Sequence, residues 1–330
     1  MIFIPFGELT RFDRSVALKF VQKHEPLCVQ LVAHIRKSSE NVFAAFLIDE
    51  NAFKLYGIVS LNKTILHCLP FASESAALDG FCLTTLKNTD ALEADFSLSL
   101  AALIKKMCLE KKLDGEDSLS CVNGTYSGGR LILDALKKLG RTPFQINQYD
   151  LLRLNFERFS QSQPFPLNDG EKIVHLKKNM DVYYRVALQR LQNDYEKEEV
   201  LPVGLLFDED SCKLRLSNAL RTQYVLALEL PCKNDGGLSI APSLKNSALV
   251  AKASTNAIGF RCAQIGGVYT DLKYRGRHYA FNTVFALLKK IHQMKKLPIL
   301  FVKKSNTNAQ KLYKNLGFEK ICDYMIAYFL

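Results

Sequence analysis

VYTDLKYRGRHYA at residues 268–280 and NTNAQKLYKNLGF at residues 306–318 decide the fold of this chain. The first stretch contains the end of a strand, a basic turn with a glycine, and the start of a long amphipathic helix. Such a turn before a helix presents backbone N–H groups to a phosphate. The second stretch follows the next apolar strand and supplies Asn306 and Tyr313. Together the two stretches predict a site for an extended ligand that carries phosphate.

The bulk properties are those of a soluble protein with two domains. The chain has 330 residues, 48% of them apolar, and this length suits two domains better than one. Its apolar runs are shorter than the roughly 18 residues that a membrane span needs. The apolar start at residues 1–5 lacks a basic flank and is predicted to be a first strand, not a signal peptide.

The nine cysteines are odd in number and scattered, with no C-x-x-C pair. This spacing argues against a disulfide framework and against a zinc site, and it indicates a reducing compartment. The histidines outside the basic turn show no partner spacing. We therefore expect a cytoplasmic protein that binds no metal.

The positive charge is concentrated around the two quoted stretches. The net charge of the chain is +11, and residues 267–330 hold 12 Lys/Arg against 3 Asp/Glu, a balance of +9. One interpretation is a field that attracts a polyanionic cofactor. Another is a solvated helix face, because lysines near a helix C-terminus suit its dipole. A nucleic-acid surface ranks behind both.

The segment 161–170, with two prolines and little periodicity, is predicted to link residues 1–160 to residues 171–330. The two parts echo each other, since each has a strand, a helix, a Leu-Gly pair and another strand in that order. Leu139-Gly140 and Leu316-Gly317 are the two pairs. Two copies of one fold account for the length. The N-terminal copy lacks the basic turn, so we expect it to have no cofactor site.

Periodicity predicts the elements on which these residues lie. Expected helices are at 13–22, 26–38, 96–110, 129–139, 181–190 with a continuation into 193–201, 212–221, 280–295 and 309–316. Expected strands are at 42–48, 54–71, 118–122, 148–154, 223–230, 248–253, 262–269, 299–302 and 321–329. Asn123-Gly124 is expected to form a turn.

The two motifs resemble the acyl-CoA site of the GNAT superfamily of N-acetyltransferases. The family's pyrophosphate motif is Gln/Arg-x-x-Gly-x-Gly/Ala, and Arg275 fits its first position and Ala280 its last. His278 stands where the family has glycine, and its side chain narrows the space for a phosphate unless the imidazole points outward. The resemblance implies that acetyl-CoA is bound by Val268, Tyr269, Thr270, Arg275, Gly276, Arg277, His278, Tyr279, Ala280 and Asn306.

The resemblance also implies that the strand ending at residues 268–270 diverges from its parallel neighbour at 299–302. Main-chain groups are then free to pair with the pantetheine amides of the cofactor.

The resemblance places Tyr313 as the general acid that protonates the departing CoA thiolate, although a core aromatic is the alternative interpretation. Glu198 or Glu199 is expected to accept the proton of the acceptor amine or to hold that amine, with a solvated helix face as the alternative. Cys262 and Gln264 stand where many members of the family place a carboxylate. Neither residue is a carboxylate, so a base that takes the proton of the amine through a water molecule is a further alternative.

The sequence thus predicts an α/β (α+β) chain of two GNAT-like domains, each with a mixed, largely antiparallel sheet flanked by helices. The predicted activity is acyl-CoA-dependent N-acyl transfer, most simply N-acetyl transfer, by direct attack of an amine in a ternary complex. The alternatives are a non-catalytic acyl-CoA-binding or scaffold protein and a Fem-type transferase that uses aminoacyl-tRNA. The expected partners are acyl-CoA and an amine acceptor, with no membrane, and the chain is expected to be a monomer or a dimer.

Overall fold

The computed structural model describes residues 1–49, 52–69, 89–110, 119–231 and 248–330. Its helices are α1 (Arg11–Lys23), α2 (Val29–Lys37), α4 (Thr89–Leu109), α5 (Tyr126–Lys138), α6 (Phe156–Gln161), α7 (Val182–Tyr195), α8 (Glu209–Thr222), α9 (Tyr279–Gln293) and α10 (Thr307–Asn315). Its strands are β1 (Ile2–Pro5), β2 (Val42–Asp49), β3 (Ala52–Leu61), β4 (Thr64–Cys68), β5 (Cys121–Thr125), β6 (Gln145–Leu154), β7 (Lys172–Leu176), β8 (Val225–Leu230), β9 (Ala248–Ile258), β10 (Cys262–Thr270), β11 (Leu297–Lys303) and β12 (Phe318–Tyr328). Short helical turns are η1 (Glu25–Leu27), η4 (Glu196–Val200) and η5 (Leu272–Tyr274).

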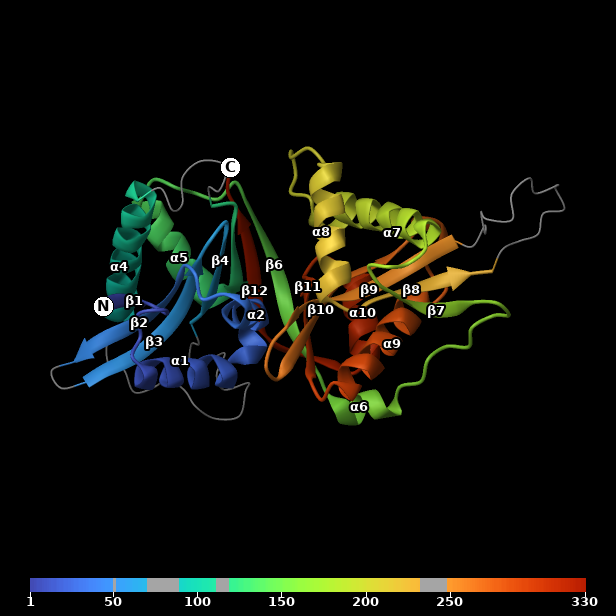
Figure 1. Cartoon of the computed structure of the whole chain (residues 1–330), viewed down its shortest axis with the longest axis horizontal. Coiled ribbons are helices and arrows are strands. Elements are labelled where there is room, and N and C mark those ends of the chain that lie inside the picture. Colours follow the sequence, from blue (N-terminus) through green and yellow to red (C-terminus); the bar gives the residue numbers. More distant parts are fainter. Residues whose placement is uncertain (50–51, 70–88, 111–118, 232–247) are drawn as a thin grey trace.

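The described strands form one 12-stranded sheet in the order β1-β2-β3-β4-β5-β12-β6-β11-β10-β9-β8-β7. The pairs β4–β5 and β10–β11 are parallel, and the other pairs are antiparallel. Figure 1 shows this sheet crossing the molecule from the blue N-terminal half to the orange and red C-terminal half. The mixed, largely antiparallel sheet expected from the sequence is confirmed.

The two halves exchange one strand each at the middle of the sheet. β6 lies between β12 and β11, and β12 lies between β5 and β6. The β6–β12 pairing runs from Leu154 opposite Phe318 to Gln145 opposite Tyr328. Each half therefore contains a strand of the other within its part of the sheet. The proposed division at residues 161–170 stays a prediction.

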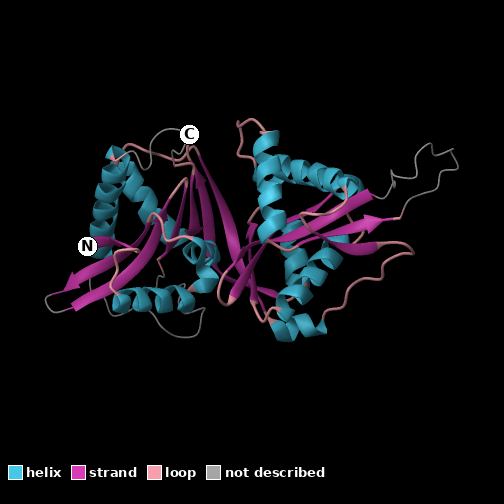
Figure 2. Cartoon of the chain, in the orientation of Figure 1, coloured by secondary structure: helices cyan, strands magenta, loops and turns pink. Residues whose placement is uncertain are grey.

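Helices cover both faces of the sheet in each half (Figure 2). In the N-terminal half, successive side chains of β2 point to opposite faces of the sheet, and both faces are buried. Phe43 and Ala45 pack in the cluster that contains α4 and α5, whereas Ala44 and Phe46 pack in the cluster that contains α1 and α2.

In the C-terminal half, α9 covers one face and α7 with α8 covers the other. The core side of α9 is formed by Val284, Leu287, Leu288 and Ile291, which are fully buried. Their spacing of three and four residues forms a single stripe on a helix, which explains why this segment packs on the sheet over its whole length.

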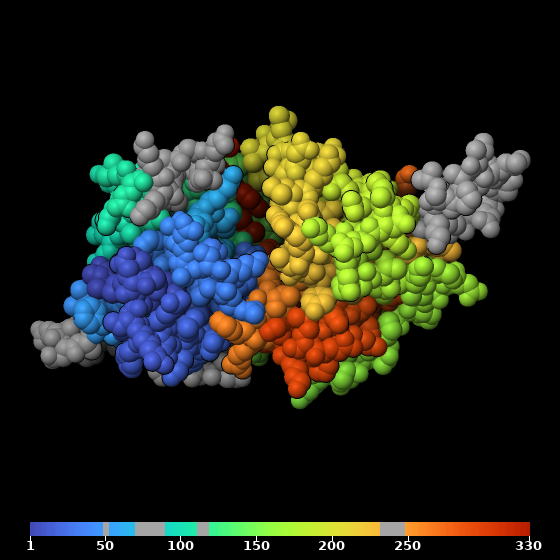
Figure 3. Space-filling view, viewed as in Figure 1, coloured from blue at the N-terminus to red at the C-terminus, as the bar shows by residue number. Residues whose placement is uncertain are grey.

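The N-terminal half supports the turn between β9 and β10 through one buried carboxylate. Glu25 of η1 accepts the backbone N–H of Arg261 at 2.9 Å and that of Cys262 at 2.8 Å, and it is fully buried. Arg36 of α2 donates to the carbonyl oxygens of Ile258 and Gly259. Figure 3 shows the orange β9–β10 turn lying against the blue N-terminal helices. One half thus positions the two strands that carry the predicted site of the other.

Two local predictions were wrong. Asn123 and Gly124 do not form a turn, because they pair with Ile326 and Met325 of the distant strand β12. The predicted strand 54–71 is two strands, β3 and β4, and its last two residues lie outside the described part of the chain. The helix predicted at 181–190, with its continuation into 193–201, is confirmed as α7 followed by the π-helical turn η4. The short elements β7 and α6 were not predicted.

We expect the substitution Gly259→Ala to lower the free energy of unfolding by about 2–4 kcal/mol. A Cβ at this position would overlap Oε1 of Glu25. The buried carboxylate would have to move, and its backbone N–H partners would lose their acceptor. Urea denaturation of the variant measures the loss.

Gly7→Ala is the matched control, since a Cβ there meets nothing within 4 Å. Equal stability of the two variants would contradict the close approach of Glu25 to residue 259.

Candidate active site

β10 and β11 are paired at one end and separate at the other. Parallel pairing is confined to Cys262, Ala263 and Gln264 of β10, while β10 continues to pair with β9 as far as Thr270. The predicted divergence of the two strands is therefore present. A strand edge that loses its neighbour leaves N–H and C=O groups available to an extended ligand.

A bulge shapes the diverging part of β10. Gly266 is opposite Ser254 and Tyr269 is opposite Lys252, so Gly267 and Val268 together face a single residue of β9. Gly267 has a φ of +59°, a left-handed conformation that favours glycine. Ser254 donates to the Gly266 carbonyl at 3.1 Å, and Lys252 donates to the Gly267 carbonyl at 2.8 Å.

The basic turn lies between the end of β10 and the start of α9, as the sequence predicts. Asp271 caps η5 by accepting the N–H of Lys273. α9 begins at Tyr279, and no side chain caps its N-terminus. The first N–H groups of this helix are therefore available to an anion, which the helix dipole also favours. Gly276, Arg277 and His278 are exposed on this turn.

Arg275 is less free than the sequence suggests. Its guanidinium pairs with Glu198 at 2.7 Å and donates to the carbonyl of Thr270 at 3.1 Å, and it lies over the ring of Tyr269. The hydroxyl of Tyr269 donates to the same carboxylate at 3.1 Å. Burial and this carboxylate raise the pKa of Tyr269 to about 12. Arg275, Tyr269 and Glu198 thus form one group that joins η4 to the basic turn.

His278 is in the left-handed conformation, with a φ of 61°, directly before α9. The backbone thus adopts here the conformation that glycine favours. The imidazole stacks on Phe165 at 3.7 Å between ring centroids. Asn282 holds the backbone of Phe165 by accepting its N–H and donating to its carbonyl. The imidazole therefore packs against the segment predicted as a linker.

Two further predicted residues have defined neighbours. Tyr279 is buried and donates its hydroxyl to Glu171 at 2.5 Å, so its side chain serves the packing of the turn. Ala280 is partly buried in the first turn of α9.

Asn306 caps α10, because its side chain accepts the N–H of Ala309 at 3.0 Å. Its amide also donates to Glu199 at 3.4 Å. Lys303 of β11 donates to the carbonyl of Glu199 at 2.6 Å and lies 3.6 Å from its carboxylate. Glu199 is thereby fixed between β11 and the start of α10.

Tyr313 lies on α10 with only 7% of its surface exposed. Burial raises the pKa of its hydroxyl, and nearby Tyr195 and Glu199 raise it further. The hydroxyl therefore keeps its proton at neutral pH. Glu199 is bound by Lys303 and by Asn306 at the start of α10, whereas Glu198 belongs to the group around Arg275.

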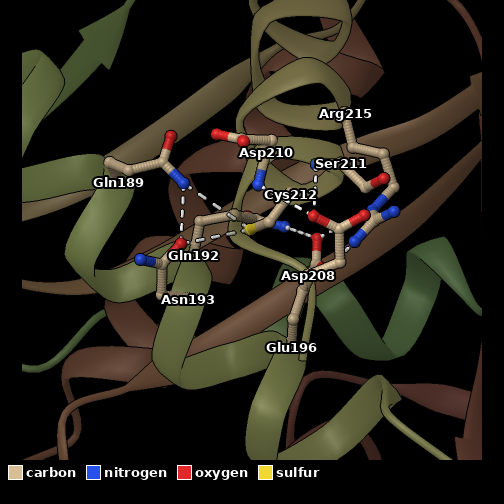
Figure 4. Close-up of polar contacts among 9 residues, drawn as sticks. All are labelled: Gln189, Gln192, Asn193, Glu196, Asp208, Asp210, Ser211, Cys212 and Arg215. Carbon is tan, nitrogen blue, oxygen red and sulfur yellow. Dashed lines mark hydrogen bonds and ion pairs between the residues drawn. The ribbon is translucent and has the colours of Figure 1, made fainter. Parts of the chain in front are cut away.

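Sequence reasoning missed a polar cluster behind the bulge, on α7, η4 and α8. Glu196 is buried and accepts hydrogen bonds from Arg215 and Gln192 (Figure 4). The Arg215 guanidinium, although burial opposes it, holds the pKa of the Glu196 carboxyl below its usual range. Lys252 was also missed. The feature of the sequence that could have indicated it is that Lys252 is the one charged residue of β9, among small and apolar residues.

Cys262 and Gln264, the alternative positions for a base, are buried in the paired part of β10. Burial raises the pKa of the Cys262 thiol. Among the described residues, no group of three or more His, Cys, Asp or Glu side chains is placed to hold a metal ion.

In the N-terminal half two parallel strands also diverge, but a side chain occupies the space beside them. β4 and β5 pair in parallel at Thr64, Ile65 and Leu66 and then separate. The ring of His67 lies where side chains at Gly124 and Gly128 would have to be, and it is buried. Burial lowers the pKa of His67 to about 3, so the ring is neutral. In this half a histidine ring fills the space beside Gly124 and Gly128, directly after the residues at which β4 and β5 pair.

Comparisons with known proteins agree with this geometry. Residues 243–327 match the family model of FR47-like proteins, a GNAT-related group. A Drosophila protein of known structure superposes with a TM-score of 0.56 at 13% identity, over 100% of this chain and 98% of its own. The chain has the tandem GNAT fold.

Two further structures support this assignment of the fold. A tandem GNAT protein from the clavulanic acid biosynthesis pathway has a TM-score of 0.50 at 11% identity, over 99% of this chain and 97% of its own. A GCN5-related N-acetyltransferase from Kribbella flavida has a TM-score of 0.50 at 11% identity, over 95% of each chain. No curated protein sequence matches the chain. None of the helices that the structure describes has the length and apolar character to span a bilayer.

The conformation of His278 predicts an order of stability for its variants. Glycine at residue 278 should give a free energy of unfolding about 1 kcal/mol higher than alanine, because both variants lose the ring but only alanine keeps the left-handed penalty. Urea denaturation of His278→Gly and His278→Ala measures the difference. An alanine variant as stable as the glycine variant would show that residue 278 leaves this conformation in solution.

Proposed function

We propose that the chain is an acyl-CoA-dependent N-acyltransferase, most simply an N-acetyltransferase, with its site in the C-terminal half. One observation carries the proposal: the strands β10 and β11 diverge, α9 begins after β10 without a side-chain cap, and α10 after β11 carries the buried Tyr313. A ligand with phosphates at one end, amides in the middle and a thioester at the other matches this order of groups.

The residues of the site fit such a ligand. The N–H groups at the start of α9, with Gly276 and Arg277 before them, would hold the pyrophosphate. The free edge of β10 at residues 267–270 would pair with the pantetheine amides, as a strand pairs with an added strand. Arg275 would hold the basic turn in place through Glu198 more than it would bind phosphate. His278 would contribute its backbone, since its ring is stacked on Phe165.

The proposed reaction is direct transfer. The amine nitrogen attacks the thioester carbonyl, the C–N bond forms, and the electron pair moves to the carbonyl oxygen. When this oxyanion collapses, the C–S bond breaks, and Tyr313 gives its proton to the thiolate. Glu199 is the better candidate for taking the proton of the amine, because it accepts a hydrogen bond from Asn306, the N-cap of the helix that carries Tyr313. Glu198 is assigned a positioning role instead.

The acceptor amine would enter from the hollow between the two halves. Figure 3 shows this hollow between the light-blue N-terminal half and the yellow helix α8, with strands β6 and β12 at its base. Glu199 and Lys303 tie η4 to β11 beside this region, and Gln145 of β6 accepts the N–H of Val203 from the loop after η4.

The N-terminal half is proposed to be a copy without a cofactor site, so residues 1–160 would support residues 171–330. His67 fills the divergence of β4 and β5, and Glu25 holds the turn that begins β10. A non-catalytic acyl-CoA-binding protein is the second candidate. The observation that favours it is the engagement of both Glu198 and Glu199 in ion pairs.

Isothermal titration and turnover test the proposal. We expect acetyl-CoA to bind with one molecule per chain, because the second divergence is filled by His67. We expect thiol release when the chain is offered acetyl-CoA with a panel of primary amines that includes amino acids, small amines and lysine peptides. Binding without thiol release for any amine would favour the non-catalytic candidate, and the absence of binding at millimolar acetyl-CoA would exclude both.

Replacing Tyr313 with phenylalanine removes the proposed acid while keeping the ring that packs on Phe318. We expect kcat with the accepted amine to fall by at least about 10-fold, with KM for acetyl-CoA little changed. Steady-state thiol release measures both constants. Tyr183→Phe on α7 is the matched control, and equal activity of the two variants would remove Tyr313 from the reaction.

A further inference from the structure

Lys252 is a buried cation placed behind the bulge of β10. It lies on β9 with 2% of its surface exposed. Its Nζ atom donates to the carbonyl oxygen of Gly267 at 2.8 Å and lies 4.3 Å from the centre of the Tyr195 ring. Burying an ammonium group is costly, so its position here calls for an explanation.

The bond to Gly267 fixes the direction of the next N–H group. The C=O and N–H groups of a trans peptide point in opposite directions. The peptide between Gly267 and Val268 is trans, and its carbonyl points toward Lys252 on β9. The N–H of Val268 therefore points away from the Nζ atom of Lys252, and Val268 lies in the part of β10 beyond the residues that pair with β11.

A hydrogen bond from a cation to a peptide carbonyl also polarises that peptide. Its N–H group becomes a stronger donor, because linked hydrogen bonds strengthen one another at low dielectric. Lys252 is thus placed to influence a donor that it does not touch.

We propose that Lys252 is a positioning residue of the acyl-transfer site, which orients and polarises the Gly267–Val268 peptide so that the Val268 N–H stabilises the thioester oxyanion. The inference rests on the proposed function. The bond changes remain those of the transfer reaction, and the Val268 N–H donates to the carbonyl oxygen while that oxygen carries the negative charge. Preorganised donors at such a position are a major source of catalysis.

The charge on Lys252 depends on its neighbours. Burial lowers the pKa of Lys252 from 10.5 to about 7, while Glu196 and Cys212 act in the opposite direction. The groups that face it are Tyr195 of α7, Glu196 of η4, Cys212 of α8 and Tyr269 of β10, and Arg215 of α8 pairs with Glu196. The polarising effect should be strongest below about pH 7, where the ammonium form prevails.

The lowered pKa also fixes the sign of the effect of Lys252 on stability. Between pH 7 and pH 10.5 the unfolded chain binds the proton that the folded chain has released, so stability rises with pH across this range. The unfavourable contribution of Lys252 is therefore largest below pH 7. A residue retained for stability alone would not show this pattern.

The test compares Lys252→Met, which keeps the length of the side chain, with the unaltered chain. At pH 6.5 we expect kcat to fall by about 10-fold or more, because the donor is weaker and less well oriented. We expect KM for acetyl-CoA to change little. We also expect the melting temperature of the variant to rise at pH 6.5, and this gain to shrink toward pH 10. Lower activity with higher stability separates positioning from a structural role.

A spectroscopic measurement needs no acceptor amine. In acetyl-CoA labelled with 13C at the thioester carbonyl, a strong donor lowers the carbonyl stretching frequency. We expect bound acetyl-CoA to show a higher frequency in Lys252→Met than in the unaltered chain. Lys252→Arg keeps the charge at all pH values, and it should restore most of the frequency shift and of kcat.

The outcomes distinguish the two proposals. Binding of acetyl-CoA with the same carbonyl frequency and the same kcat in Lys252→Met overturns the role of Lys252 and leaves the transferase proposal intact. A lower melting temperature of this variant at pH 6.5 also overturns it in favour of a structural role. A frequency shift without turnover for any amine supports the role of Lys252 and counts against transferase activity. Failure of the unaltered chain to bind acetyl-CoA overturns both.

Discussion

The pairing of β6 with β12 is the constraint on which the rest of the structure depends. Each strand leaves its own half and completes the sheet of the other, so that β5, β12, β6 and β11 are consecutive. Because β11 is paired with β6 along its length from Ile299 to Lys303, it cannot follow β10 as β10 turns away. The divergence that forms the candidate site is thus held open from the side of the N-terminal half. The buried carboxylate of Glu25 holds the other strand at its start.

The same divergence occurs in both halves, and its consequences depend on a few side chains. At β10 the bulge is formed by Gly267 and Val268, and Lys252 and Ser254 donate hydrogen bonds to the carbonyl groups of Gly267 and Gly266. At β4 the ring of His67 fills the corresponding space against Gly124 and Gly128. An extended ligand needs both backbone groups and space for its own chain. Under the proposed function, the divergence of the strands supplies the backbone groups, and Gly266 and Gly267 leave space beside them.

Much of the C-terminal half could be predicted from the sequence, because its signals are local. The period of α9, the cap at Asn306 and the basic turn each depend on residues that are close in the chain. The exchange of β6 and β12 could not be predicted, since an alternating strand pattern does not say which strand lies beside it. For the same reason Asn123-Gly124 was taken for a turn. The role of Glu25 was also hidden, because its partners are more than 230 residues away.

The basic segment and the acidic run around η4 were treated as separate features of the sequence, and the structure joins them. Arg275 pairs with Glu198, and Lys303 pairs with Glu199. Ion pairs that are partly exposed add at most about 1 kcal/mol each to stability, so their main effect here is on position. They attach one π-helical turn to the two sides of the divergence, to β10 and its basic turn on one side and to β11 on the other. Lys273 and Arg277 are exposed on the turn before α9, and they lie where the helix dipole adds to the attraction of an anion.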